Sequence, residues 1–518
     1  MFASTTKNDI STDKTKQTQH YSNRQSIFFW GVVLALIVIA IGMRLYHLGL
    51  LFDRDGYDEG VYWQTLRSMS AGNTLYKQIF YSQPPFFMLS TFPGYILFGS
   101  SLWSARLGIA LISLLGLLGA FLLGKALSGR LGAIAAMLLL IVNPLYLAQS
   151  QTIEAEASST ALSLLAIGLA YLWWEHPEGT RGLFYAALTG IAITLSILCK
   201  LLSIAVFVPI ALLIVARVWQ IWHKQPGTRL NGLLPILVGI TTCILTFVVL
   251  LLPFSGSYQA VLQSVITFHS TAAQIYGHSQ QANIPTLQNA LTSLLALTAC
   301  SGTVAALLRR DWRVVPLIGW LIATLYLLWH QVPLFQHHLI ALTPPLIALA
   351  VIGIGNHSLS SKETSSNVMS KAVPFFTWIT IALIIITTIL NVQQDRLYYR
   401  TAVTTSASGF TQLESKVATD LRMATDPNQL VVTDAQFIAG LANRTTPPEL
   451  VDTSAVRITS NYLTLSQLES ATSRPQVRAV LFFTGRFYLQ NVAGFHSWVT
   501  QHFHLLHNYG AGKELWVR

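Results

Sequence analysis

Charged residues are scarce in this sequence: Lys, Arg, Asp and Glu together make up 10% of its 518 residues. Soluble domains carry about a quarter, whereas 52% of this chain is hydrophobic and its mean hydropathy is +0.51. This scarcity excludes a soluble globular protein and indicates a chain that buries its surface against lipid. The formal charge of +11 does not indicate a nucleic-acid partner, because the basic residues are scattered in short loops between apolar runs.

Cysteine is also rare. The three cysteines, Cys199, Cys243 and Cys300, lie in or beside apolar runs. Their number and spacing exclude a disulfide framework and a cysteine-type metal site. The sequence also lacks a glycine-rich phosphate loop and any internal repeat.

Apolar runs long enough to cross a bilayer, whose core takes about 20 helical residues, recur along the chain. They lie near 27–46, 102–123, 131–148, 157–174, 182–198, 201–219, 232–252, 288–307, 314–330, 338–355 and 372–391. We therefore expect an α-helical polytopic membrane protein with about eleven transmembrane helices. Residues 1–25 are polar and rich in Ser, Thr and Lys, which predicts a disordered tail.

The distribution of Lys and Arg predicts the orientation, because cytoplasmic loops of membrane proteins carry an excess of basic residues. The tail and alternate loops contain Lys7, Lys14, Lys16, Arg24, Lys125, Arg130, Arg181, Arg217, Lys224, Arg229, Arg309, Arg310, Arg313, Lys362 and Lys371. The intervening loops are acidic or neutral, and residues 253–287 contain no Asp, Glu, Lys or Arg. We expect a multi-pass protein of the plasma membrane with a cytoplasmic N-terminus.

The segment "QPPFFMLSTFPGYILFG", residues 83–99, is apolar but short and contains three prolines. If it crossed the membrane, every later loop would change sides and the basic loops would face outward. We therefore predict a helix that lies in the outer interface or dips into it. Residues 48–101 then form one large extracytoplasmic loop within a transmembrane domain spanning 26–391.

The chain after residue 391 is polar and mixed. Alternating apolar patterns predict strands at 429–434, 477–483 and 513–518, and helical patterns cover 411–424 and 464–471. Residues 392–518 are therefore predicted to form a small extracytoplasmic α/β domain.

Two pairs of acids fall on the predicted outer side. Asp58 and Glu59 stand in "DRDGYDEGVYWQTL", directly after the first apolar run, and Glu154 and Glu156 stand in the second outer loop. Carboxylates that lie close together can share a proton, bind a cation or act as a base on a hydroxyl. Simpler alternatives stay open, since Asp58 could cap a helix over 59–71 and the second pair could lie in a solvated turn.

Two basic residues also lie at outer helix ends. Lys200 stands between two apolar runs in "LSILCKLLSIAVF", and Arg106 begins the second run. A charge at membrane depth is costly without a partner, which predicts an anion such as a lipid phosphate. The alternative is that both side chains reach out to the lipid headgroups.

Histidines add a third group of polar residues on this side. His337 and His338 open the tenth apolar run, in "FQHHLIALTPPLIALA". Adjacent helical residues point about 100° apart, so we expect no shared metal site and instead hydrogen bonding to a phosphate or sugar. His269 and His278, in the uncharged segment, are weaker candidates.

The order of these features resembles a known family. A first helix with a cytoplasmic N-terminus is followed by a large loop with an Asp-Glu pair, then "QPPFFMLSTFPGYILFG", "SARLGIAL", an acidic second outer loop and a mid-chain Lys. This arrangement resembles the C-type integral-membrane glycosyltransferases, especially the dolichyl-phosphate-mannose protein mannosyltransferase superfamily and its bacterial aminoarabinose transferases. The resemblance covers about residues 27–391 and rests on order, spacing and sidedness rather than on one motif.

The resemblance implies a hexosyl or pentosyl transferase. A sugar carried on a polyprenyl phosphate would be transferred, with inversion, to a hydroxyl of a lipid, glycan or protein acceptor on the outer side. Many such enzymes work without a metal, so no cofactor is implied and a divalent metal stays open. The C-terminal domain resembles a variable accessory part that selects the acceptor.

The resemblance also assigns roles by position. Asp58 matches the family's candidate base, with Glu59 in support, and either Glu154 or Glu156 matches the second-loop acid. Basic positions associated with the donor phosphate match Arg106 and Lys200. His337 and His338 stand where relatives often have an Arg-Tyr pair, so their role departs from the family pattern.

Two other classes of function remain open. A transporter or flippase would place ionisable residues mid-span and show repeated halves, whereas here the ionisable residues cluster at outer helix ends. A non-catalytic cell-envelope assembly protein could use the same scaffold.

Overall fold

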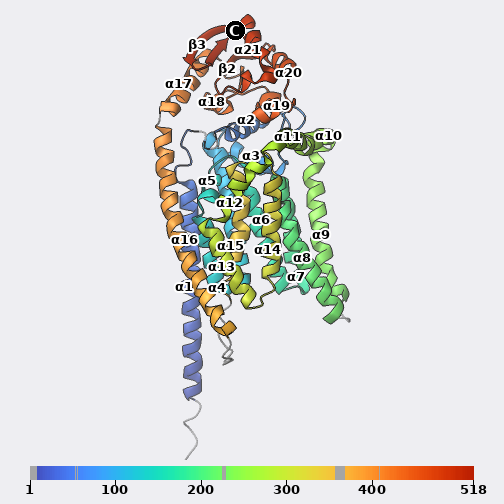
Figure 1. Ribbon diagram of the computed structural model, residues 1–518, viewed down its shortest axis with the longest axis vertical. Helices are drawn as coiled ribbons and strands as arrows, with labels where there is room; N and C mark the ends of the chain where they lie inside the picture. Colours follow the sequence, from blue (N-terminus) through green and yellow to red (C-terminus); the bar gives the residue numbers. More distant parts are fainter. Residues whose placement is uncertain (1–8, 53, 55, 225–228, 356–367, 408) are drawn as a thin grey trace, which may run out of the picture.

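The computed structural model describes residues 9–52, 54, 56–224, 229–355, 368–407 and 409–518. A bundle of long helices forms the body of the molecule, and a small domain with the C-terminus covers one end of it (Figure 1). The long helices are α1 (Asp9–Leu45), α4 (Leu102–Ile141), α6 (Ala155–Glu175), α7 (Gly179–Cys199), α8 (Phe207–Lys224), α9 (Arg229–Leu251), α13 (Leu294–Leu308), α14 (Val314–His330), α15 (Thr343–Ile352) and α16 (Val368–Ser406).

Shorter elements connect these helices and gather toward the end that carries the small domain (Figure 1). They are α2 (Asp58–Ser70), α3 (Phe86–Leu97), α5 (Pro144–Gln149), η1 (Leu201–Val206), η3 (Leu252–Ser257), α10 (Tyr258–Leu262), η4 (Gln263–Thr267), α11 (Phe268–Tyr276), η5 (Gly277–Ala282), α12 (Asn283–Leu291) and η6 (Gln336–Leu342).

Within the described residues, seven helices are long and apolar enough to cross a membrane, or eight if the bent pair Gln280–Leu291 and Leu294–Leu308 is one span. The predicted count of about eleven is therefore not reached. Two predicted runs, 314–330 and 338–355, form apolar helices of at most 17 residues. Two others, 102–123 and 131–148, fall largely within the single element α4.

Helix α4 reverses direction at a break. Ser128 and Gly129 have non-helical backbone angles, and the positive φ of Gly129 (63°) favours glycine. A Cβ atom on Gly124 would lie 2.3 Å from the carbonyl oxygen of Gly132. Residues eight apart in a continuous helix are roughly 12 Å apart, so this contact requires the two arms to lie side by side. Each arm corresponds to one of the predicted runs.

Helix α1 begins at Asp9, so the predicted disorder of the N-terminal tail is not confirmed for residues 9–25. Helix α3 has 12 residues and is too short to cross a bilayer core of about 30 Å. That length agrees with the predicted interfacial helix. Helix α16 continues past the predicted domain boundary at 391 as far as Ser406.

The C-terminal region contains the predicted α/β elements. Its described elements are α17 (Gly409–Ala424), β1 (Leu430–Thr433), α18 (Gln436–Leu441), η7 (Pro448–Leu450), α19 (Ala455–Thr459), α20 (Leu465–Thr472), β2 (Val477–Phe482), η8 (Arg486–Tyr488), η9 (Gln490–Val492), α21 (Gly494–His502), β3 (His504–Gly510) and β4 (Lys513–Val517). Its described strands have the order β1-β2-β4-β3, in which β1 and β2 are parallel and the other pairs antiparallel. Strand β3 was not predicted.

The small domain packs closely on helix α2. A Cβ atom on Gly60 would lie 2.5 Å from the backbone nitrogen of Phe437, and one on Gly440 would lie 2.5 Å from the Trp63 ring. The buried Gln64 amide donates to the Gln436 carbonyl at 3.3 Å. Such contacts require glycine and leave no room for solvent, so the domain and α2 form one packed unit.

The predicted orientation can be tested with cysteines at exposed positions, in a background without the three native cysteines. Ser497, in α21, and Thr180, in the first turn of α7, are both exposed. We expect Ser497→Cys to react with a membrane-impermeant maleimide on intact cells, and Thr180→Cys to react only after permeabilisation, because basic loops stay cytoplasmic. The reverse labelling pattern would overturn the orientation.

Candidate active site

A cavity of about 790 Å³ lies between the helical bundle and the C-terminal domain. Its walls come from segments far apart in the sequence. They include Tyr57, Asp58, Ser82, Glu154, Glu156, Lys200, Phe268, His269, Phe335, His337, His338, Asp452, Ser454 and Arg486. Six of the eight predicted site residues therefore line one cavity, and the two exceptions are Glu59 and Arg106.

Asp58 is the first residue of α2, and the N-cap is Tyr57. The alternative prediction that Asp58 caps the helix is therefore wrong by one position. A carboxylate in the first turn is favoured by the unpaired N–H groups and dipole of the helix N-terminus. Asp58 also lines the cavity.

Glu59 points away from the cavity and pairs with Arg106. Both side chains are fully buried, and two bonds of 2.7 Å join the guanidinium to the two carboxylate oxygens. The other three Arg106 N–H groups donate to the carbonyls of Leu48, Leu50 and Phe52. A guanidinium has five N–H donors, and all five are used here.

This geometry corrects the prediction for Arg106 and gives Glu59 a structural role. Arg106 has no N–H group left for a donor phosphate, and it does not line the cavity. Glu59 accepts four hydrogen bonds, because the backbone N–H groups of Arg54 and Ile153 also donate to it. The pair fixes the first loop onto the bundle, which is a structural task.

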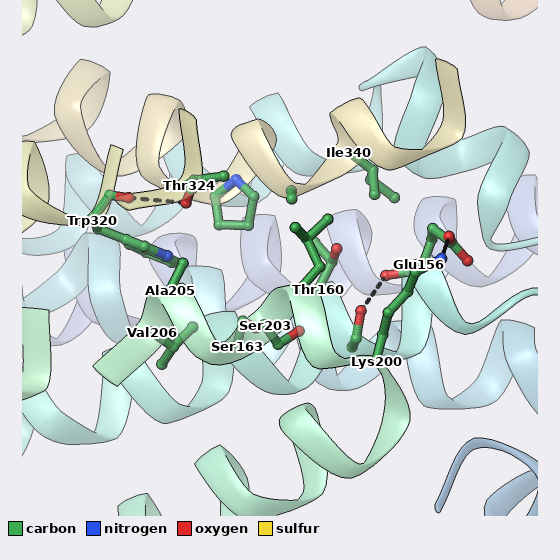
Figure 2. Close-up of a pocket in the computed structure, with 14 residues that line it drawn as sticks. Glu156, Thr160, Ser163, Lys200, Ser203, Ala205, Val206, Trp320, Thr324 and Ile340 are labelled. Atoms are coloured by element: carbon green, nitrogen blue, oxygen red, sulfur yellow. Dashed lines mark hydrogen bonds and ion pairs between the residues drawn. The ribbon is translucent and has the colours of Figure 1, made fainter. Parts of the chain in front are cut away.

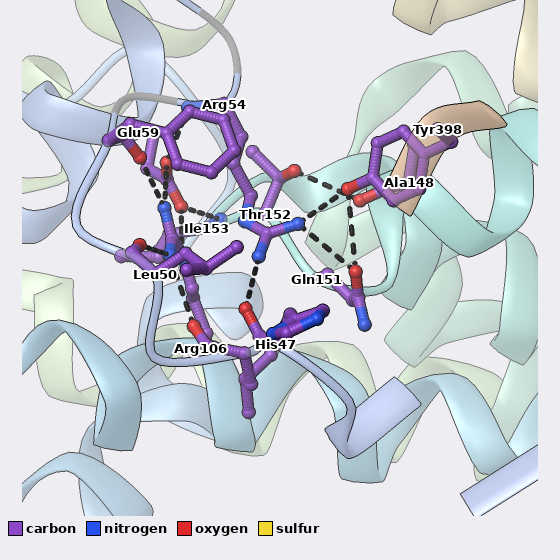
Figure 3. A network of polar contacts seen from close by, with 12 residues as sticks. His47, Leu50, Arg54, Glu59, Arg106, Ala148, Gln151, Thr152, Ile153 and Tyr398 are labelled. Carbon is purple, nitrogen blue, oxygen red and sulfur yellow. Dashed lines mark hydrogen bonds and ion pairs between the residues drawn. The ribbon is translucent and has the colours of Figure 1, made fainter. Parts of the chain in front are cut away.

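A second polar network extends from the same loop to α16 (Figure 3). The Arg54 guanidinium donates to the Gln151 side chain at 3.0 Å, to the Tyr398 hydroxyl and to the His47 carbonyl at 2.7 Å. The sequence alone does not mark these residues as partners. Arg54 was visible as a charge beside an apolar run, but nothing in the sequence indicated its distant partners.

Glu154 and Glu156 flank the start of α6 and are both buried. The solvated turn considered for them is therefore wrong. Lys200 lies at the break between α7 and η1 and forms an ion pair with Oε1 of Glu156 (Figure 2). The anionic partner that the sequence predicted for Lys200 is thus a side chain of this protein. Its side chain is 13% exposed, which argues against the alternative that it reaches out to the lipid headgroups.

The two adjacent histidines converge on the same carboxylate. Nε2 of His337 lies 3.7 Å, and Nε2 of His338 3.8 Å, from Oε1 of Glu156. Ligand atoms of these three residues all lie within 4.8 Å of one another. The expectation of no shared metal site rested on the two rings pointing apart; that premise is wrong, because both rings lie within 3.8 Å of Glu156, which comes from another helix.

This set of three residues has the spacing of a metal site, but its hydrogen bonding favours an anion. The backbone N–H of Phe335 donates to Nδ1 of His338 at 3.2 Å. A neutral ring therefore carries its proton on Nε2, the nitrogen that faces Glu156. A metal would need a lone pair on that nitrogen and would have to displace the Lys200 ammonium.

Several cavity residues are weak candidates from the sequence or carry no sequence signal. His269 lines the cavity, and its Nε2 lies 2.8 Å from the Ser82 carbonyl oxygen. The His278 side chain lies outside the described residues. Asp452 and Arg486 enter the cavity from the C-terminal domain, and only the docking of that domain reveals them.

Arg486 is held over the start of α2. Its guanidinium carbon lies 3.7 Å from the centre of the Tyr57 ring, a cation–π contact. Asp434 accepts hydrogen bonds from the backbone N–H groups of Phe483, Thr484 and Arg486 and so fixes the loop. Burial raises the pKa of Tyr57 well above its ordinary value. The C-terminal domain therefore holds the residue that precedes Asp58.

Comparison with known proteins agrees with this architecture. Residues 82–252 match the family model described as dolichyl-phosphate-mannose-protein mannosyltransferase. ArnT from Cupriavidus metallidurans is structurally similar in the apo state, with a TM-score of 0.59, 13% sequence identity, and coverage of 96% of this chain and 98% of that one. The predicted resemblance to the C-type membrane glycosyltransferases is confirmed.

Two further structures support the same fold. ArnT from C. metallidurans bound to undecaprenyl phosphate has a TM-score of 0.59 and 15% identity, over 94% of this chain and 98% of that one. The archaeal oligosaccharyltransferase AglB from Archaeoglobus fulgidus, in complex with an inhibitory peptide and a dolichol-phosphate, has a TM-score of 0.53 and 15% identity, over 91% and 71%. A search of curated protein sequences finds no significant match.

The buried pair predicts a stability defect. The lysine ammonium has three N–H donors and cannot replace the five N–H donors of the planar arginine guanidinium. Arg106→Lys therefore leaves some buried carbonyl or carboxylate oxygens without a hydrogen bond. We expect a loss of about 3–5 kcal/mol, seen as a lower thermal unfolding temperature in detergent. The control is Arg400→Lys, at an exposed position. A fully stable Arg106→Lys variant that no longer binds polyprenyl phosphate would contradict this structural role and indicate that Arg106 binds the donor phosphate.

Proposed function

We propose that this protein transfers a sugar from a polyprenyl-phosphate donor to an acceptor hydroxyl in the cavity beneath the C-terminal domain. The observation that carries the proposal is that Asp58 and the group formed by Lys200, His337 and His338 line the same cavity. A carboxylate base and a cluster of nitrogen donors are the two parts that such a transfer needs.

Asp58 is the proposed general base. The acceptor oxygen forms a bond to the anomeric carbon of the sugar, and the bond from that carbon to the phosphate oxygen breaks. The hydroxyl proton goes to the Asp58 carboxylate, and the leaving group is the polyprenyl phosphate. Attack from the side opposite the phosphate inverts the anomeric carbon. Tyr57 and Glu59, each held in place by its own contacts, position Asp58 from both sides along the chain.

Lys200, His337 and His338 are the proposed phosphate-binding residues. Charge develops on the phosphate oxygen as the sugar leaves, and pre-positioned nitrogen donors stabilise it in a water-poor site. Figure 2 shows Lys200 beside Glu156, next to a crevice lined by Thr160, Ser203 and Ile340. The similar ArnT structure with bound undecaprenyl phosphate supports a lipid phosphate as the ligand class.

The C-terminal domain is the proposed acceptor-side wall. It contributes Asp452, Ser454 and Arg486 to the cavity, where hydroxyl, carboxylate and guanidinium groups can bind a polar acceptor. Phe268, His269 and Ala272, from the uncharged segment 253–287, line another side. The acceptor then arrives from water while the donor arrives from the membrane.

The base is tested with Asp58→Asn, which keeps the side chain's size and removes its ability to accept the proton. A positioned base contributes roughly 10²–10⁴-fold in rate, so sugar transfer by the purified protein should fall by that factor while binding of polyprenyl phosphate persists. Asp426→Asn, at an exposed position, is the control. Transfer at the wild-type rate would move the base to Glu154 or Glu156.

The phosphate site is tested with Lys200→Ala. We expect at least tenfold weaker binding of undecaprenyl phosphate to the purified protein in detergent, because a charge-assisted contact to the phosphate is lost. Lys77→Ala makes the same change at an exposed position and should bind like the wild type. Unchanged affinity in Lys200→Ala would remove Lys200 from the site.

A further inference from the structure

A single carboxylate oxygen stands at the centre of the proposed phosphate-binding group. Oε1 of Glu156 forms the ion pair with Lys200 and lies 3.7 and 3.8 Å from Nε2 of His337 and His338. The Glu156 side chain is 4% exposed. Three nitrogen groups from two separate parts of the chain thus surround one anionic oxygen.

The same three groups would suit an oxygen of a phosphate. Lysine ammonium and imidazole N–H groups bind carboxylate and phosphate oxygens by the same charge-assisted hydrogen bonds. The contact from the Phe335 N–H leaves the neutral His338 ring with its proton on Nε2, so that nitrogen acts as a donor toward either anion. A phosphate that took these donors would have to displace Glu156 or lie beside it.

We propose that the Glu156 carboxylate occupies the phosphate position in the ligand-free protein and competes with the donor and product phosphates for Lys200. This inference rests on the proposed function, since it concerns the same phosphate site. Two anions side by side in a buried site repel each other strongly, so ligand binding requires Glu156 to release Lys200.

The competition has a consequence for turnover. The donor is a phosphodiester with one negative charge, whereas the product is a phosphomonoester that carries nearly two at neutral pH. Repulsion by Glu156 therefore acts more strongly on the product than on the donor. Glu156 returns to Lys200 as the product leaves, which favours product release and keeps the buried lysine neutralised between cycles.

The test compares binding of undecaprenyl phosphate to the purified wild-type protein and to Glu156→Gln in detergent. Glutamine keeps the side chain's size and removes its charge, so we expect about tenfold tighter binding and stronger product inhibition of sugar transfer. Undecaprenol, which lacks the phosphate, should bind both proteins equally. Glu154→Gln is the matched control, because Glu154 is a buried carboxylate of the same segment whose Oε1 lies 3.8 Å from the other ring nitrogen of His337, Nδ1. Its affinity should change less.

Equal or weaker binding by Glu156→Gln than by the wild type would overturn the inference. If that variant does not fold, Glu156→Ala serves the same comparison, since it also removes the charge. Wild-type binding that is lost with EDTA, is restored by Zn²⁺ or Mg²⁺ and is absent in Glu156→Gln would also overturn it, in favour of a cation site. Failure of the wild type itself to bind undecaprenyl phosphate, with or without added metal, would instead reject the proposed function.

Discussion

The end of the helical bundle that carries the C-terminal domain depends on one buried ion pair. Arg106 on α4 holds both oxygens of Glu59 and three carbonyl groups of the segment that follows α1. Out of water, neither charge can lose its partner without a large free-energy penalty. The first loop, α2 and α4 therefore have one stable arrangement, and the direction in which Asp58 points follows from it.

The adjacent acids Asp58 and Glu59 consequently point in different directions. Successive helical residues point about 100° apart, so once Glu59 turns into the bundle, Asp58 turns toward the cavity. The two acids of the second acidic loop also have different partners. Glu156 forms an ion pair with Lys200, while Glu154 lies near Nδ1 of His337, on the other side of that ring. In both loops, one carboxylate neutralises a buried cation beside the site.

Local patterns predicted much of the fold. The strands at 429–434, 477–483 and 513–518 contain β1, β2 and β4, and helices α17 and α20 lie where helical periodicity placed them. Strand β3 escaped prediction because it is a mostly exposed edge strand without the alternation of a half-buried one. The count of spans differed for two reasons: the predicted runs 314–330 and 338–355 form helices of at most 17 residues, and the runs 102–123 and 131–148 fall largely within the single element α4.

The sequence by itself determined the class of protein and the helix ends at which its polar residues gather. Charges are expensive in lipid, so their few positions already mark helix ends. Only the tertiary structure decided which charges meet: Arg106 with Glu59, and Lys200 with Glu156. Those pairings depend on how helices distant in sequence pack, and the residues contributed by the C-terminal domain depend on its docking against α2. Packing of this kind is a property of the whole chain, which no single segment encodes.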